Sequence, residues 1–163
     1  MKLNVRPKCV QSTRFGRGHT FVSKDVRLWK AAVNKELQQY IPDKPCSGPV
    51  RILELKYCFK LPDTPAATTD DLCALFQLIN GIAVPGKSRK DRLANLYRFL
   101  ESGMYKLPYL AKADLKDNLN KGLMDCLTGK FFEDDSQIWE DMHSSKVYST
   151  EDCIHLVLEM RNT

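Results

Sequence analysis

The segment "VRILELKYCFKL", residues 50–61, alternates polar and apolar side chains along most of its length. A repeat of two places successive side chains on opposite faces of an extended chain, which is typical of a β-strand that covers a core. The segment "IPDKPCSGP" before it and the proline- and threonine-rich segment after it both interrupt regular structure. The pattern therefore predicts one long strand.

Helical patterns lie on both sides of this strand in the sequence. Ser23 is placed to cap a helix over residues 24–40, in which apolar residues recur every three or four positions. Thr69 is placed to cap a short helix that ends at Gly81, since glycine commonly ends a helix. The strand is thus expected to be joined to helices at both ends.

The remaining segments complete a mixed pattern. Ser88 followed by Asp91 forms a capping-box pattern that opens another helix, and residues 114–127 have a helical repeat. Shorter strands are predicted at "MKLNV", within residues 131–149 and at "EDCIHLVLEM". The order predicts an α+β fold, in which residues 1–163 form a single domain with a small mixed β-sheet and helices packed on it.

The composition excludes several classes of protein. Of the 163 residues, 43% are hydrophobic and 28% are charged, which is typical of a globular domain. No run approaches the roughly 20 apolar residues that span a bilayer, and the N-terminus has no apolar signal core. The six cysteines show no C-x-x-C spacing, so we expect reduced thiols in a cytoplasmic protein. Neither a membrane nor a small-molecule cofactor is indicated.

Charge is distributed unevenly along the chain. Residues 1–30 contain eight Lys or Arg residues and one acid, whereas residues 131–163 contain eight acids and two basic residues. A polyanion such as DNA would bind the basic end, and a divalent cation would bind the acidic end. Arginine forks in a loop contact phosphates well. The predicted phosphate contacts are Arg14 and Arg17, followed by Lys8, Lys24, Arg89 and Lys90.

The segment "DLKDNLNKGLMDCL", residues 114–127, has two contrasting sides when read as an α-helix. Leucines at every fourth position form an apolar side. The opposite side carries Asp114, Asp117, Asn118, Lys121 and Asp125. Such a charged side can be only a solvated surface with salt bridges between Lys121 and its neighbours. It can also be a metal-binding surface.

The second reading requires carboxylates from separate segments that meet in space. Hydrolysis of a phosphodiester needs an activated water and neutralised phosphate charge, and carboxylates that hold Mg²⁺ or Mn²⁺ supply both. The candidates are Asp114 and Asp117, together with Asp134 or Asp135 of the acidic turn. Lys121 can neutralise a phosphate oxygen or the leaving group.

The stretch "KADLKDNLNKGLMDCLTGKFFEDDSQI" resembles the signature of RusA-type Holliday junction resolvases. That family reads K-P-D-L-D-N-L-x-K, then D-A-L, then a D-D-x-Q-[IV] turn. The matching positions, in the family's order, are Asn118–Leu119, Lys121, Asp125–Leu127 and Asp134–Ile138. Fainter similarity extends to the basic loop after the first strand and to the basic segment before the aspartates.

The resemblance implies a RusA-like, dimeric, Mg²⁺-dependent endonuclease, with Mn²⁺ as a possible substitute. Such enzymes nick four-way DNA junctions symmetrically and act in bacterial or phage-infected cells. By position, Asp117 and Asp135 correspond to metal-binding aspartates of the family, and Lys121 corresponds to its essential lysine. This chain reads D-L-K-D where the family reads D-x-D, so Asp114 is a ligand only if a helix begins early enough to include it. Residues 63–86 look like an insertion.

Two other interpretations remain open at this level. In the first, the altered aspartate spacing marks a lost catalytic site, and the chain binds junctions or other DNA without cutting them. In the second, the same metal site serves flaps, forks or RNA, because several branched nucleic acids present similar phosphates. Comparison of cleavage on junction, fork and duplex substrates separates these alternatives.

Overall fold

The computed structural model describes residues 1–10, 14–16, 19–111 and 115–162. The chain forms two compact units. The sheet unit comprises Met1–Tyr57, Ala111–Ser145 and Cys153–Thr163, and the helical unit comprises Cys58–Leu110 and Lys146–Asp152. Helices and strands both contribute, so the predicted α+β class is confirmed. Within the described residues, no helix is long and apolar enough to cross a membrane.

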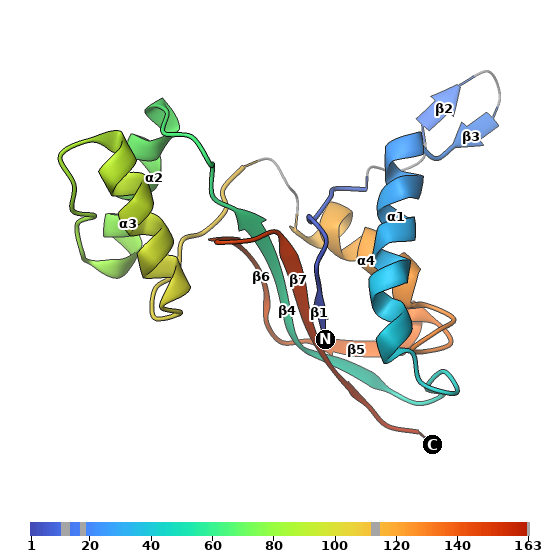
Figure 1. The fold of residues 1–163 in the computed structure, drawn as a ribbon. Coiled ribbons are helices and arrows are strands. Elements are labelled where there is room, and N and C mark those ends of the chain that lie inside the picture. The colour runs from blue at the N-terminus through green and yellow to red at the C-terminus, as the bar shows by residue number, and fades with distance from the viewer. Residues whose placement is uncertain (11–13, 17–18, 112–114, 163) are drawn as a thin grey trace. The chain divides into compact units, whose positions relative to one another are not determined.

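The strands form a mixed sheet, as predicted. Its order is β1-β7-β4-β5, and β6 also pairs with β4. Parallel pairing joins β4 to β5, whereas β1 and β7 are antiparallel (Figure 1). The strands are β1 (Lys2–Leu3), β4 (Val50–Lys60), β5 (Ile138–Asp141), β6 (Ser144–Ser149) and β7 (Cys153–Met160).

Two details of the strand prediction were wrong. The single strand expected within residues 131–149 is divided into β5 and β6, and both pair with β4. The segment expected to be a loop before the first helix contains a small antiparallel hairpin of β2 (Arg14–Gly16) and β3 (His19–Phe21). Strands of three residues are too short to show an alternating pattern in the sequence.

The first helix, α1, spans Lys24–Leu37 and continues as a 3₁₀ turn over Gln38–Tyr40, which agrees with the predicted range. Ser23 is its N-cap, because the Ser23 side chain accepts a hydrogen bond from the Val26 backbone N–H at 3.3 Å. Its buried residues recur with the helical period and form one side of the sheet unit's core. They are Val26, Trp29, Val33 and Leu37.

The helical unit contains α2 (Ala67–Asn80) and α3 (Arg89–Glu101), which pack against each other (Figure 1). The capping box of α3 is confirmed, since Ser88 and Asp91 exchange side chain–backbone hydrogen bonds of 3.1 Å. Thr69 was wrongly predicted to be the N-cap of α2. The N-cap is Ala66, three residues earlier, and the Thr69 hydroxyl instead accepts a hydrogen bond from the Ala66 N–H.

The helical unit has its own core. Phe76 of α2 stacks on Phe99 of α3 with ring centroids 5.1 Å apart, and Tyr105 lies against both rings. Gly81 ends α2 with a φ of 70°, a left-handed conformation that glycine adopts without strain. Most of the predicted insertion, residues 63–86, therefore folds into a packed helix and its cap. The buried core residues are Leu61, Leu72, Cys73, Phe76, Leu96 and Leu107.

Candidate active site

The segment that resembles the family's aspartate motif is not a continuous α-helix. Residues Leu115–Asn120 form the π-helix η2, and an α-helix, α4, follows over Lys121–Leu127. A π-helix closes its hydrogen bonds from residue i to i+5, whereas an α-helix closes them over four residues. The expectation that residues 114–127 share one α-helical face was therefore wrong over 115–120.

The apolar side of this segment is buried as predicted. Leu119, Leu123 and Leu127 are each at most 1% exposed. At Gly122 the backbone approaches other segments very closely, because an added Cβ would lie 2.4 Å from Cγ2 of Val10. The Val10 backbone N–H also donates to the Asn118 carbonyl at 3.1 Å. The N-terminal segment thus holds η2 and α4 in place.

The polar side of the segment is partly described. Lys121 begins α4 and is exposed, while Asp117 lies in η2. Asp114 lies outside the described residues. Asp125 was expected to pair with Lys121, but it forms an ion pair with Lys30 of α1 at 2.8 Å. Asp125 therefore links α4 to α1, and Lys121 projects into solvent where a phosphate can reach it.

The acidic turn is held by its own side chains. Asp134 accepts a hydrogen bond from the Ser136 backbone N–H at 2.8 Å, and the Gln137 side chain accepts one from the Asp134 N–H at 2.8 Å. The amide of Gln137 also donates to the carbonyls of Cys46 and Gly48. The hydrogen bonds from Ser136 hold the pKa of Asp134 below its usual range. Asp134 thus shapes the turn.

Asp135 occupies the first position of this turn, the 3₁₀ helix η3 (Asp135–Gln137), and its side chain is exposed. Asp134 and Gln137 supply the capping hydrogen bonds, so the turn does not consume the carboxylate of Asp135. An exposed carboxylate on a fixed turn is a suitable ligand for a hard cation. The capping role of Asp134 therefore leaves Asp135 as the candidate ligand of this turn.

A polar contact beside the motif was not predicted, because no spacing rule points to it. Asn120 donates to Oδ2 of Asp141 at 3.4 Å, and the Ser144 hydroxyl donates to the same carboxylate at 2.6 and 2.8 Å. Burial, and to a smaller extent the charge of Asp141, raises the pKa of the fully buried Tyr57. Only the fold brings Asn120 and Asp141 together, and their contact joins the start of α4 to the end of β5.

The predicted phosphate contacts lie in different parts of the chain. Lys24 is the exposed first residue of α1, and Lys8 is 3.6 Å from Asp25. Arg14 lies in β2, whereas Arg17 is outside the described residues. The other two candidates belong to the helical unit.

In the helical unit, Asp70 holds two arginines. Arg89 and Arg92 approach it at 2.8 and 2.6 Å, respectively. The Arg89 guanidinium is therefore partly neutralised by Asp70. Lys90, the next residue of α3, is exposed.

Residues 81–159 match the family model described as endodeoxyribonuclease RusA. The matched range contains η2, α4 and the acidic turn, so the resemblance predicted from residues 112–138 is confirmed. The class that this segment defines is that of the endodeoxyribonucleases. Within that class, the segment is similar to the RusA family. No curated protein matches the sequence.

The donors at the candidate site suit a divalent metal. Asp117 and Asp135 offer carboxylate oxygens, which Mg²⁺ and Mn²⁺ prefer to nitrogen or sulfur. The exposed carboxylate of Asp135 is not used by its own turn, so it can bind an ion without breaking the fold. The chemistry of these donors is therefore compatible with the metal that the family resemblance implies.

Proposed function

We propose that this chain is a Mg²⁺-dependent endonuclease that resolves four-way DNA junctions by paired, symmetric nicks. The observation that carries the proposal is the RusA match over residues 81–159, which includes Asp117, Lys121 and Asp135. Support also comes from the exposure of Lys121 and Asp135 beside well-packed backbone segments. A nuclease that acts on recombining DNA would work in the cytoplasm of a bacterial or phage-infected cell.

Each residue has a distinct role in this mechanism. The bound metal would polarise the scissile phosphate and activate a water molecule. Asp117 and Asp135, with Asp114 as a further candidate, would hold the metal through carboxylate oxygens. Lys121 neutralises charge on a phosphate oxygen or on the leaving group. Asn120 and Asp141 position Lys121, because their contact fixes the beginning of α4.

The DNA backbone would be held mainly by the basic N-terminal region. Arg14 and Arg17 are the leading candidates, with Lys8, Lys24 and Lys90 as secondary ones. Arg89 would have to exchange its contact with Asp70 for a phosphate, which reduces its contribution. Each phosphate contact releases condensed counterions, so loss of one contact lowers the salt dependence of binding by about one unit in the log–log slope.

Symmetric nicks require two sites related by a two-fold axis, so the active form in this proposal is a homodimer. The test is cleavage of a labelled four-way junction by the wild type and by Asp117→Asn, each with and without Mg²⁺. We expect paired nicks only from the wild type with Mg²⁺. Junction binding without cleavage under every condition would favour the non-catalytic alternative. Stronger cleavage of forks or flaps than of junctions would show that these are the preferred substrates.

A further inference from the structure

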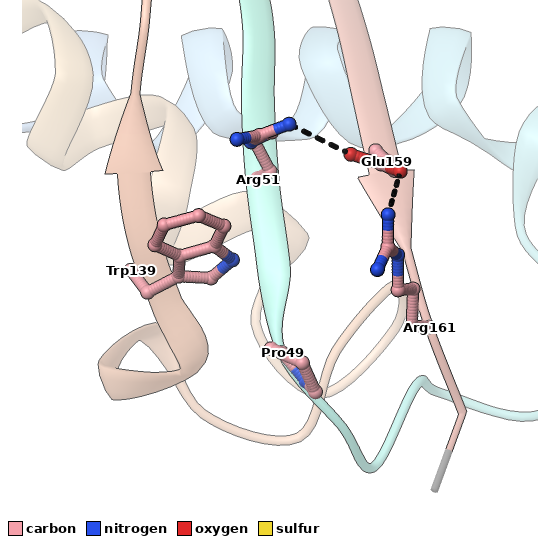
Figure 2. A pocket seen from close by; sticks show the side chains of 5 residues that line it. All are labelled: Pro49, Arg51, Trp139, Glu159 and Arg161. Carbon is pink, nitrogen blue, oxygen red and sulfur yellow. Dashed lines mark hydrogen bonds and ion pairs between the residues drawn. The ribbon is translucent and has the colours of Figure 1, made fainter.

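A chain of ion pairs crosses one face of the sheet unit. Arg51 of β4 approaches Glu140 of β5 at 2.5 Å and Glu159 of β7 at 3.4 Å. Glu159 also pairs with Arg161, just beyond the end of β7, at 2.8 Å. The four side chains therefore form the series Glu140, Arg51, Glu159, Arg161, in which the sign of the charge alternates. Figure 2 shows the last three of these side chains lying together over β4 and β7.

An exposed aromatic side chain lies beside this series. The register between β4 and β5 shifts at Val50–Arg51, so Trp139 lies between the residues that pair with β4. Trp139 is 62% exposed, and the Arg51 guanidinium lies 4.8 Å from the centre of its ring system. The contact with Arg51 restricts the rotation of the indole, whose ring remains largely exposed to solvent.

Trp139 and three members of the charged series (Arg51, Glu159 and Arg161) line a shallow pocket of about 260 Å³, with Pro49 at one edge (Figure 2). The lining is mostly apolar, although two arginines and a glutamate contribute to it. Tryptophan and arginine are the residues most enriched at the energetic centres of protein–protein interfaces. This face of the sheet therefore has the composition of an interface centre.

The charges on this face indicate what binds there. Two arginines and two glutamates cancel, so the face offers no net positive charge to DNA, unlike residues 1–30. A protein with the same alternation of charges would be complementary to it. The simplest protein of that kind is another copy of this chain, because a two-fold axis through the middle of the series sets each position against a position of opposite sign.

We propose that this face, centred on Arg51, Trp139 and Glu159, is where two copies of the chain meet. A two-fold axis that passes between Arg51 and Glu159 sets Arg51 of one copy against Glu159 of the second copy, and the reverse contact forms as well. The outer members, Glu140 and Arg161, also have opposite signs. Trp139 of each copy then covers the pocket of the other. The inference rests on the proposed function in one respect only, which is that paired nicks require a dimer.

The test reverses one charge at a time and measures mass by light scattering at about 10 µM. The wild type should have twice the monomer mass of 18.7 kDa. Arg51→Glu would place two pairs of glutamates in contact, and Glu159→Arg would place two pairs of arginines in contact, so each variant should be monomeric. Lys35→Glu, an exposed change on α1, is the control and should remain dimeric.

An equimolar mixture of the two monomeric variants gives the sharpest result. In the mixed pair, the glutamate introduced at position 51 of one chain would face the arginine introduced at position 159 of the other. The unchanged Glu159 of the first chain would face the unchanged Arg51 of the second, so both contacts are attractive again. We therefore expect heterodimers in the mixture, although neither variant dimerises alone. Single variants that remain dimeric, a mixture that remains monomeric, or a monomeric wild type would each overturn the proposal.

Trp139→Ala provides a second test that does not depend on the charge reversals, because an exposed side chain contributes little to folding. We expect the dissociation constant of the dimer to rise by about 30-fold or more, as for a central interface tryptophan. An unchanged dissociation constant would contradict the proposal. Junction cleavage is measured separately: a dimer of this kind without Mg²⁺-dependent cleavage would refute the proposed function and leave this surface intact.

Discussion

The two segments that carry the candidate metal ligands have different backbones. Asp135 begins a 3₁₀ turn that Asp134 and Gln137 cap with their side chains. Asp117 lies in a π-helix, which runs directly into α4. The first segment is thus held by local hydrogen bonds, whereas the second is held by what packs against it, at Val10 and in the leucine-lined core.

This difference shows how two parts of one site can respond differently to mutation. Side chain–backbone hydrogen bonds in the acidic turn depend on a few adjacent residues, so single substitutions there should have limited effects on stability. The π-helix holds one more residue per hydrogen-bonded turn than an α-helix, so its formation depends on the number of residues in the segment. The response of this segment to mutation should therefore be tested by deletion of a residue as well as by substitution.

The largest expected effect is on catalysis and is common to both segments. Asp117→Asn and Asp135→Asn should each reduce Mg²⁺-dependent cleavage by about a thousandfold or more, since the lost metal contact is worth several kcal/mol in the transition state. Junction affinity should be retained, because each change removes negative charge. Rates come from single-turnover assays, and affinities from gel shifts in Ca²⁺.

Asp125→Asn and Glu133→Gln are the matched controls, one for each segment. Asp125 pairs with Lys30, and Glu133 is an exposed neighbour of the turn. Both variants should cleave at close to the wild-type rate. Cleavage by Asp135→Asn at that rate would remove Asp135 from the site, and the same result for Asp117→Asn would leave η2 without a catalytic role.

The next effect is on stability and concerns only the π-helical side. In Gly122→Ala the new methyl group would lie 2.4 Å from Cγ2 of Val10, whose β-branched side chain is stiff. Overpacking of this kind costs about 1–3 kcal/mol, so urea should unfold the variant at a lower concentration. Val10→Ala combined with Gly122→Ala should be less damaging than the sum of the two changes. Strict additivity would show that the two positions do not touch.

A smaller, pH-dependent effect is expected at the acidic turn. Hydrogen bonds from Ser136 lower the pKa of folded Asp134, so its carboxylate stabilises the turn above the unfolded pKa of about 3.9 and ceases to do so as the pH falls through the folded value. Asp134→Ala should therefore lower the melting temperature more at pH 7 than at pH 3. Asp134→Asn retains an acceptor and should show a smaller loss at pH 7. An equal loss at both pH values for Asp134→Ala would contradict this role.

Much of this could be predicted from the sequence because it depends on local rules. The caps of α1 and α3 are hydrogen bonds between side chains and backbone groups three residues apart, so Ser23, Ser88 and Asp91 were found from their spacing. The leucines of α4 recur with the helical period, which identified the buried side.

Other features depend on contacts between distant segments, which spacing does not reveal. The partner of Asp125 is Lys30, and the partner of Asn120 is Asp141; both pairs form only when separate elements fold together. The position of Trp139 follows from a register shift between β4 and β5. The π-helix could not be read from apolar periodicity either, since six residues are too few to separate it from an α-helix.

The smallest expected effect concerns the residue that distinguishes this chain from the family pattern. Deletion of Lys116 changes D-L-K-D-N-L to D-L-D-N-L and removes one residue from η2. Had residues 114–127 been one α-helix, the deletion would rotate Asp114 by about 100° relative to Asp117 and impair cleavage. In a π-helix the surplus residue can be removed by closing the turn to an α-turn, which leaves the buried leucines of α4 in register. We therefore expect cleavage and melting temperature close to wild type.

Deletion of Asp125 in α4 is the control, because an α-helix has no surplus residue there and Leu127 would leave the core. If the two deletions prove equally damaging, η2 does not accommodate the extra residue in this way.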